Sequence, residues 1–151
     1  MMMLRMSRKT LLAIEAVLDV AYNARPNPVQ SRDITARQGI PQRYLEQVLQ
    51  HLVRKGVLKG VRGPRGGYTL ARERRRVTLG DVVRVISLMD ADEDAAIGGA
   101  ELGEHIIGPI WMKHQDELLA KLDTITMEDL CNKARDAGIG RTDEETIDFT
   151  I

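Results

Sequence analysis

The chain has 151 residues, a length that allows one domain, or one domain with an appendage. It contains 22 Lys and Arg and 22 Asp and Glu, so its formal net charge is +0. A single cysteine excludes an intramolecular disulfide framework and fits a reducing cytosol. No apolar run reaches the roughly 18–20 residues of a membrane span, and Glu15 interrupts the apolar start before a signal peptide is complete. We therefore expect a cytoplasmic protein that makes no contact with a membrane.

The zero net charge hides two halves of opposite sign. Residues 1–80 hold 16 basic and 5 acidic residues, a net charge of +11, and residues 81–151 hold 6 and 17, a net charge of −11. Such a split is typical of a basic nucleic-acid face with an acidic remainder. Two solvated surfaces without a partner are the alternative, which we favour less because the positive half coincides with the motif described below.

The first predicted element is an amphipathic helix over about residues 8–24, preceded by Ser7. Its apolar residues recur at helical spacing and define one face, formed by Leu11, Ile14, Leu18, Ala21 and Tyr22. A loop over residues 23–28, with two prolines, follows this helix.

Residues 31–56 predict two helices joined by a tight turn. Ser31 can cap the first helix, because its hydroxyl accepts from a free N–H of the first turn. Gly39 follows that helix, where a left-handed residue is favoured, and Pro41 begins the next helix, where its missing N–H costs nothing. Gly56 ends the second helix, whose apolar stripe is formed by Leu45, Val48, Leu49, Leu52 and Val53.

The opposite face of this second helix is polar. It carries Gln42, Arg43, Glu46, Gln47 and Gln50. These side chains can donate to or accept from base edges, and Arg43 can also meet a phosphate. The pattern predicts a recognition helix.

Two short strands are predicted at residues 57–61 and 68–70. The loop between them consists of Arg62, Gly63, Pro64, Arg65, Gly66 and Gly67. Three glycines and a proline favour turn geometry, and two arginines on a projecting tip have the reach and charge for phosphates or a minor groove. Together with the preceding helices, this hairpin predicts a winged helix-turn-helix, which is a DNA-binding unit.

Capping boxes predict two helices in the second half, one at Thr78 with Asp81 and one at Thr126 with Asp129. The basic run at residues 72–76 could touch a DNA backbone, but we interpret it as a solvated linker because it leads straight from the wing to the first of these helices. The acidic residues 89–104 predict a mobile loop, and the acidic residues 139–151 predict a poorly ordered end of the chain.

A longer helix is predicted over about residues 105–123, with Pro109 tolerated in its first turn. One side of this helix is apolar and carries Ile107, Ile110, Trp111, Leu118 and Leu122. A complete winged-helix domain leaves such a surface to a partner. We expect that partner to be a second copy, since dimers match two-fold DNA sites.

Much of the chain resembles the bacterial iron–sulfur-cluster regulator family of winged helix-turn-helix transcription factors, which contains IscR-, NsrR- and CymR-like members. The resemblance is carried by RQGIPQRYLEQVLQHLVRKGVLKGVRGPRGGYTLA, by Leu18 to Ala21, by TLGDVV and by Ile110 to Leu130, and so covers nearly all of the chain to about residue 136. It implies a homodimeric transcription factor whose recognition helix enters the major groove.

The resemblance also implies roles for individual residues. Arg43, Glu46 and Gln47 map to the base-reading positions, and Arg62 maps to the wing arginine that enters the minor groove. The full set expected at double-stranded DNA is Ser31, Gln42, Arg43, Tyr44, Glu46, Gln47, Arg62, Gly63, Pro64, Arg65, Gly66 and Gly67. Arg43 replaces a residue that is often small in relatives, and Arg65 replaces a frequent glycine, so we do not assume a relative's operator.

The sensor region departs from the family. Cluster-binding members carry three closely spaced cysteines before the long helix, whereas residues 90–104 contain none, and an auxiliary histidine of some relatives is replaced by Gly108. A cluster needs thiolates that Cys131 alone cannot supply. We therefore expect no cofactor, and a protein or small molecule as the effector.

Other chemistry has weaker support. Glu101, Glu104, His105 and His114 could gather a metal across a dimer, but zinc sites usually present three or four ligands at tighter spacing, so we expect no metal. Cys131 could be a redox switch, although a small apolar residue of the last helix is the favoured interpretation. No nucleophile–base–orienter set stands out, so we expect no enzyme.

The sequence thus predicts a mostly α fold with a small β-hairpin wing, and a DNA-binding regulator that we expect to be a repressor. Its parts are a DNA-binding domain at 1–88, a sensor-position loop at 89–104, a dimerisation helix with a terminal helix at 105–136, and a tail at 137–151. The alternative function is a winged-helix protein-interaction module that uses the acidic C-terminal half. The basic wing and the polar recognition face argue against it.

Overall fold

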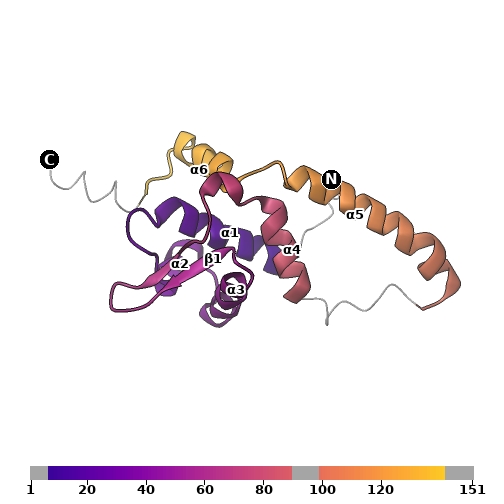
Figure 1. The fold of residues 1–151 in the computed structure, drawn as a ribbon, viewed down its shortest axis with the longest axis horizontal. Helices are drawn as coiled ribbons and strands as arrows, with labels where there is room; N and C mark the ends of the chain where they lie inside the picture. The colour runs from indigo at the N-terminus through magenta and orange to yellow at the C-terminus, as the bar shows by residue number, and fades with distance from the viewer. Residues whose placement is uncertain (1–6, 90–98, 142–151) are drawn as a thin grey trace.

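The computed structural model describes residues 7–89 and 99–141, and its central element is helix α1 (Arg8–Asn23). The Ser7 hydroxyl accepts from the Thr10 N–H at 3.2 Å and so caps α1, which begins directly after it. Most of the other helices and a two-stranded antiparallel hairpin are arranged around α1, whereas the helix Gly108–Leu122 extends away from it (Figure 1). The predicted fold class, mostly helical with a small wing, is confirmed.

The helix-turn-helix consists of α2 (Ser31–Gln38) and α3 (Gln42–Arg54). Gly39 ends α2 with φ of 67°, the left-handed conformation predicted for it. The prediction that Ser31 caps α2 is wrong: Gln30 occupies the cap position without a side-chain bond, and Ser31 is the first helical residue. Helix α3 likewise starts one residue later than predicted, because Pro41 with ψ of 130° is its cap rather than its first residue.

The wing consists of β1 (Leu58–Val61) and β2 (Gly67–Leu70), in a register that pairs Leu58 with Leu70. A backbone bridge between Val29 and Tyr68 ties β2 to the segment before α2. The wing is therefore attached to the helix-turn-helix on both of its sides.

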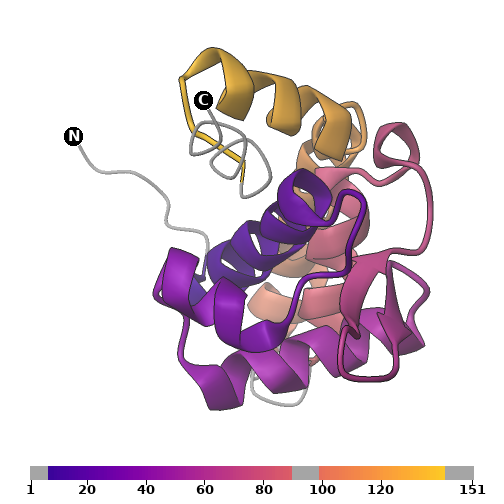
Figure 2. The same ribbon diagram turned by 90° about the vertical axis from the view of Figure 1, so that its left-hand side faces the viewer.

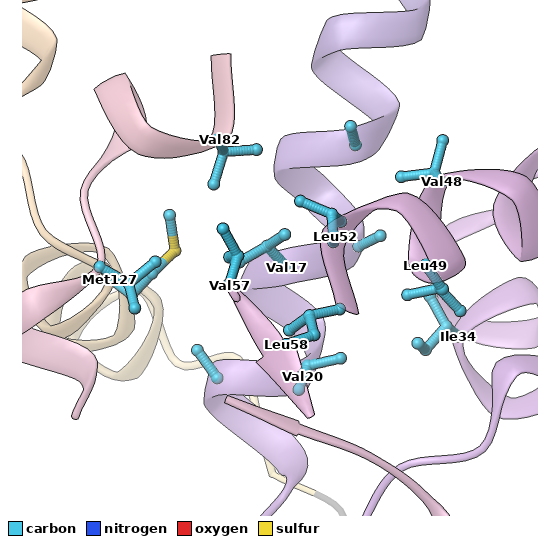
Figure 3. Packing of buried hydrophobic residues seen from close by; sticks show 14 of the residues in the cluster. Val17, Val20, Ile34, Val48, Leu49, Leu52, Val57, Leu58, Val82 and Met127 are labelled. Carbon is cyan, nitrogen blue, oxygen red and sulfur yellow. The ribbon is translucent and has the colours of Figure 1, made fainter. Parts of the chain in front are cut away.

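A single core joins these elements. Figure 3 shows its close-packed side chains, among them Val17, Val20, Ile34, Val48, Leu49, Leu52, Val57, Leu58, Val82 and Met127. Each such side chain contributes roughly 1.5–3 kcal/mol when it is fully buried. The apolar stripe of α3 supplies most of the core on its side, as predicted, with Val53 only partly buried.

The predicted apolar face of α1 is partly wrong. Leu11 is 46% exposed, and Ile14 and Leu18 are half-buried. Ala21 and Tyr22 of the predicted face are buried, and the other apolar residues that face the core are small: Ala13, Ala16, Val17 and Val20. Helix α1 is packed against α2, α3, β2, α4 and α6, so its buried side needs small residues. Hydrophobic spacing alone assigns the larger apolar residues to the buried side and therefore misplaces the core face.

Both predicted capping boxes are present. Thr78 and Asp81 exchange side-chain bonds at the start of α4 (Leu79–Met89), and Thr126 and Asp129 do the same for α6 (Met127–Asp136). The predicted linker contains a short 3₁₀ turn, η1 (Arg74–Arg76), that packs against α6.

The long helix begins earlier than predicted. A π-helical segment, η2 (Leu102–Ile107), runs directly into α5 (Gly108–Leu122), so residues 102–104 are helical rather than part of a loop. The wider turn accommodates Pro109, whose ring crowds the carbonyl four residues earlier in a regular helix. Of the mobile loop predicted over residues 89–104, residues 90–98 lie outside the described residues, and of the acidic tail predicted over residues 137–151, residues 142–151 lie outside them.

Candidate nucleic-acid interface

The polar faces of α2 and α3 are joined by a network of side-chain hydrogen bonds. Thr35 Oγ1 donates to Gln42 Oε1 at 2.8 Å, and Gln42 Nε2 donates to Ser31 Oγ at 3.1 Å and to Glu46 Oε1 at 2.9 Å. Three of the residues expected at DNA, Ser31, Gln42 and Glu46, are thus brought together. Thr35 was not among the residues predicted from the sequence. Only its position seven residues before Gln42 relates the two in the sequence.

The other predicted base-reading residues, Arg43 and Gln47, are exposed on α3. Their side chains are available to a ligand, and Gln47 lies one turn after Arg43 on the same helix face. Tyr44 is half-buried, and its hydroxyl donates to the Lys9 carbonyl at 2.6 Å. This bond joins α3 to the start of α1, so Tyr44 has a structural partner in addition to its expected place at the DNA.

The wing tip is held in a defined shape. Arg62, Gly63, Pro64 and Arg65 are exposed, and Gln30 Nε2 donates to the Pro64 carbonyl at 3.4 Å. Gly66 is buried, and a Cβ there would overlap the Val61 carbonyl oxygen. At Gly67, with φ of 152°, a Cβ would overlap the Val29 carbonyl oxygen. Gly66 therefore allows the tight turn of the wing itself, and Gly67 allows β2 to lie against the segment before α2.

An open recess of about 630 Å³ lies between the helix-turn-helix and the wing. Ser31 lines it from α2, and Arg62, Gly63, Gly66 and Gly67 line it from the wing. Gln30 and Arg32, which the sequence did not mark, also line this recess. Both residues could have been predicted from their position at the first turn of α2, because the free backbone N–H groups at the start of a helix favour a phosphate.

Helix α5 presents the apolar surface predicted for it. Ile107, Ile110, Trp111 and Leu118 are between 51% and 55% exposed, whereas Leu122 is half-buried. Figure 1 shows α5 extending away from the winged-helix body. Three further exposed apolar residues that were not predicted add to this surface: Leu102 at 76%, Ile106 at 53% and Met112 at 55%.

The weaker candidates are not assembled in the chain. Among the described residues, no three His, Cys, Asp or Glu side chains come together as a metal site, and His114 Nδ1 lies 3.4 Å from Glu117 Oε2. Cys131 is buried; burial raises the pKa of its thiol, and the nearby Arg74 opposes that rise only in part. Within the described ranges, no helix has the length and apolarity needed to cross a membrane.

This chain is similar to known proteins in both sequence and fold. The family model described as Rrf2, iron-dependent transcriptional regulator, matches residues 6–133. The HTH-type transcriptional regulators IscR of Escherichia coli O1:K1 and Cronobacter sakazakii are each 35% identical over 131 residues, 85% of this chain and 81% of theirs.

Two solved structures agree with this match. The structure of T. potens IscR has a TM-score of 0.72 at 31% identity and covers 91% of this chain and 93% of its own. The structure of CymR, the global cysteine regulator of B. subtilis, has a TM-score of 0.64 at 26% identity and covers 87% and 98%. The chain therefore belongs to the Rrf2 family of winged-helix, DNA-binding transcriptional regulators.

Proposed function

We propose that the chain is a homodimeric transcriptional repressor that binds double-stranded DNA through α3 and the wing and carries no iron–sulfur cluster. The observation that supports this most directly is the placement of the polar residues. Arg43, Glu46 and Gln47 of α3 and Arg62 and Arg65 of the wing are all exposed. In both ribbon views, α3 and the hairpin lie on the side of the body away from α6 (Figures 1 and 2).

Each group has a different part in this proposal. Gln47 bonds an adenine edge, and Glu46, already held by Gln42, accepts from a cytosine amino group. Arg62 enters a narrow minor groove, where the negative potential favours a permanently charged side chain. Arg32, which lines the recess, and Arg65, at the exposed tip of the wing, contact phosphates. No catalytic role is part of the proposal.

The dimer is proposed to form through η2 and α5. These two segments carry most of the large apolar side chains that are exposed among the described residues, and two copies related by a two-fold axis would place two recognition helices on one duplex. The absence of a cluster is proposed from the sequence, since one cysteine cannot hold one. Anaerobic purification with iron and sulfide analysis tests this, and stoichiometric iron with acid-labile sulfide would contradict it.

The DNA-binding proposal is tested by selecting genomic fragments with the purified protein and titrating the selected duplex against a scrambled duplex. We expect tighter binding to the selected duplex, and an affinity that falls linearly in log–log form as salt rises, because basic side chains displace counterions. Placement of the selected sites over promoters, with lower transcription in the presence of the protein, would support repression. Equal affinity for both duplexes would contradict sequence-specific regulation.

A further inference from the structure

Three arginines line a small recess on the far side of the molecule from the recognition helix. It lies between the end of α1, β2 and η1 and has a volume of about 180 Å³. Its lining includes three arginines, Arg25, Arg72 and Arg74, and four apolar residues, Val20, Ala21, Ala24 and Leu70. We call this feature the arginine recess. Figure 2 shows η1 next to α6, away from α3, so the DNA proposed to lie on α3 would not reach it.

The positive charge in the arginine recess is poorly compensated. Neither Arg25 nor Arg74 forms an ion pair within the described residues, and Glu73, the only acid lining the recess, pairs with Arg75 at 2.6 Å. Arg72 Nη2 lies 3.7 Å from Asp81 Oδ2, an oxygen that also accepts from the Thr78 N–H. The carbonyl end of α1 offers roughly half an elementary negative charge, which is small beside three guanidinium groups.

Two further observations concern Arg74, which is half-buried, and its effect on Arg25, which like Arg72 is exposed. Arg74 Nε is buried and has no hydrogen-bond partner among the described residues, which is uncommon for a buried donor. Burial, followed by repulsion from Arg74 and Arg141, lowers the pKa of Arg25, and Cys131 and Glu128 oppose that lowering only in part. An anion would relieve the repulsion and accept the unused hydrogen bonds.

We propose that the arginine recess binds a small free anion, a carboxylate or phosphate with a short apolar part, and that this anion is the effector of the regulator. The guanidinium groups bind the charged end in forked geometry, and the α1 and β2 side chains contact the apolar part. The volume is below the ~300 Å³ of drug-sized pockets, which favours a ligand of few atoms.

The effector role rests on the proposed DNA-binding function, whereas the anion site does not. β2 is the return strand of the wing, and Thr69 and Leu70 line the recess. An anion that draws Arg25 and Arg74 together would therefore contact the base of the wing at β2. The tip of the same wing carries Arg62 and Arg65. Binding at the recess would change the position of the wing and hence the affinity for DNA.

The anion site is tested by calorimetric titration of the DNA-free protein with inorganic phosphate, acetate, succinate and citrate at constant ionic strength. We expect saturable one-site binding of at least one of them, and at least tenfold weaker binding by Arg74→Gln and by Arg25→Gln. The matched control is Arg76→Gln, which removes a charge from the same run but does not line the recess. Absence of saturable binding, or equal loss in the control, would overturn the site. Circular dichroism confirms that each variant is folded.

The chain's own acids after Arg141 are a second source of the same chemistry. A full-length variant with Asp143→Asn, Glu144→Gln and Glu145→Gln distinguishes the sources. Unchanged affinity for the free anion supports the proposal, and binding that occurs only in this variant overturns it, because the chain then occupies its own site. The effector role is measured separately, as the change in duplex affinity on adding the anion. An unchanged duplex affinity would overturn that role, while loss of DNA binding without the anion would contradict the proposed function instead.

Discussion

Arg37 holds the carboxylate of Asp19 in a two-point ion pair that joins α2 to α1. Its Nε donates to Oδ2 at 2.9 Å and its Nη2 donates to Oδ1 at 2.8 Å, while Gln38 Nε2 also donates to Oδ2 at 2.8 Å. The side chain of Asp19 is fully buried, and that of Arg37 is 30% exposed. The hydrogen bond to Asp19 raises the pKa of Arg37. The pair positions the last turn of α2, directly before the turn that leads to the recognition helix.

Removing Arg37 should destabilise the fold. In Arg37→Met the buried carboxylate keeps only Gln38 as a side-chain partner, and breaking a buried pair in this way costs about 3–5 kcal/mol. Urea unfolding at pH 7 measures the loss. Arg32→Met removes an exposed charge from the same helix and should change stability by less than about 0.5 kcal/mol. Equal midpoints for the two variants would show that the pair contributes little.

The wing should depend on Gly67 more than on Gly60. In Gly67→Ala the new Cβ meets the Val29 carbonyl oxygen in an unfavourable backbone conformation, at a cost of roughly 1–3 kcal/mol. The Val29–Tyr68 bridge should open and duplex affinity should fall. At Gly60, on β1, a Cβ has open space, so Gly60→Ala is the matched control. The idea fails if both variants bind DNA like the parent chain.

Base reading and phosphate contact should separate by their salt dependence. Gln47→Ala should lose roughly 1–3 kcal/mol on the selected duplex and relax preference at one base pair per half-site. Arg65→Ala should weaken all sequences alike and reduce the salt slope by about one per lost phosphate contact. Arg62→Ala should show part of each effect, because groove width depends on sequence. An unchanged ratio of selected to scrambled binding in Gln47→Ala would place the reading face elsewhere.

The proposed dimer should depend on Trp111. This side chain is 55% exposed in the single chain, and Trp111→Asp would place an unpaired charge in the interface at a cost of several kcal/mol. Light scattering should then report monomers. Ala120→Asp, exposed nine residues later and thus on the opposite side of α5, should leave the dimer intact. A dimeric Trp111→Asp protein would move the interface away from α5.

Acid should weaken the attachment of α5 to α4. Arg84 donates to both carboxylate oxygens of Asp123, at 2.5 and 2.8 Å, and Gly80 leaves room for that carboxylate, because a Cβ there would overlap it. The hydrogen bond from Arg84 lowers the pKa of Asp123. The contribution of the Arg84–Asp123 pair to the free energy of unfolding is therefore fully present above the usual Asp pKa of about 3.9. It is lost as the pH falls through the lower pKa that Asp123 has in the folded protein.

The measurement is the melting temperature of the parent chain and of Asp123→Asn between pH 7 and pH 2. The parent should be more stable at pH 7, and the difference should shrink on the acid side. Asp136→Asn, at an exposed carboxylate of α6, is the control and should follow the parent throughout. A difference that is independent of pH would mean that the amide substitution acts through packing.

Local chemistry in the sequence was sufficient for most elements. Capping boxes at Thr78 and Thr126 and the left-handed Gly39 act within a few residues, so their signals are independent of the rest of the chain. The polar face of α3 and the basic wing follow from composition and helical spacing in the same way. The family resemblance then added the roles of individual residues, which composition alone does not carry.

Only the tertiary structure decided how these elements meet. The Asp19–Arg37 pair and the Gly80–Asp123 approach join residues that are distant in sequence, so no local pattern predicts them. The core face of α1 was misplaced because several elements share that helix and select small residues at the contacts. The arginine recess arises for the same reason: Arg25 and Arg74 belong to segments that are separated by the whole helix-turn-helix and wing, and folding alone brings their charges together.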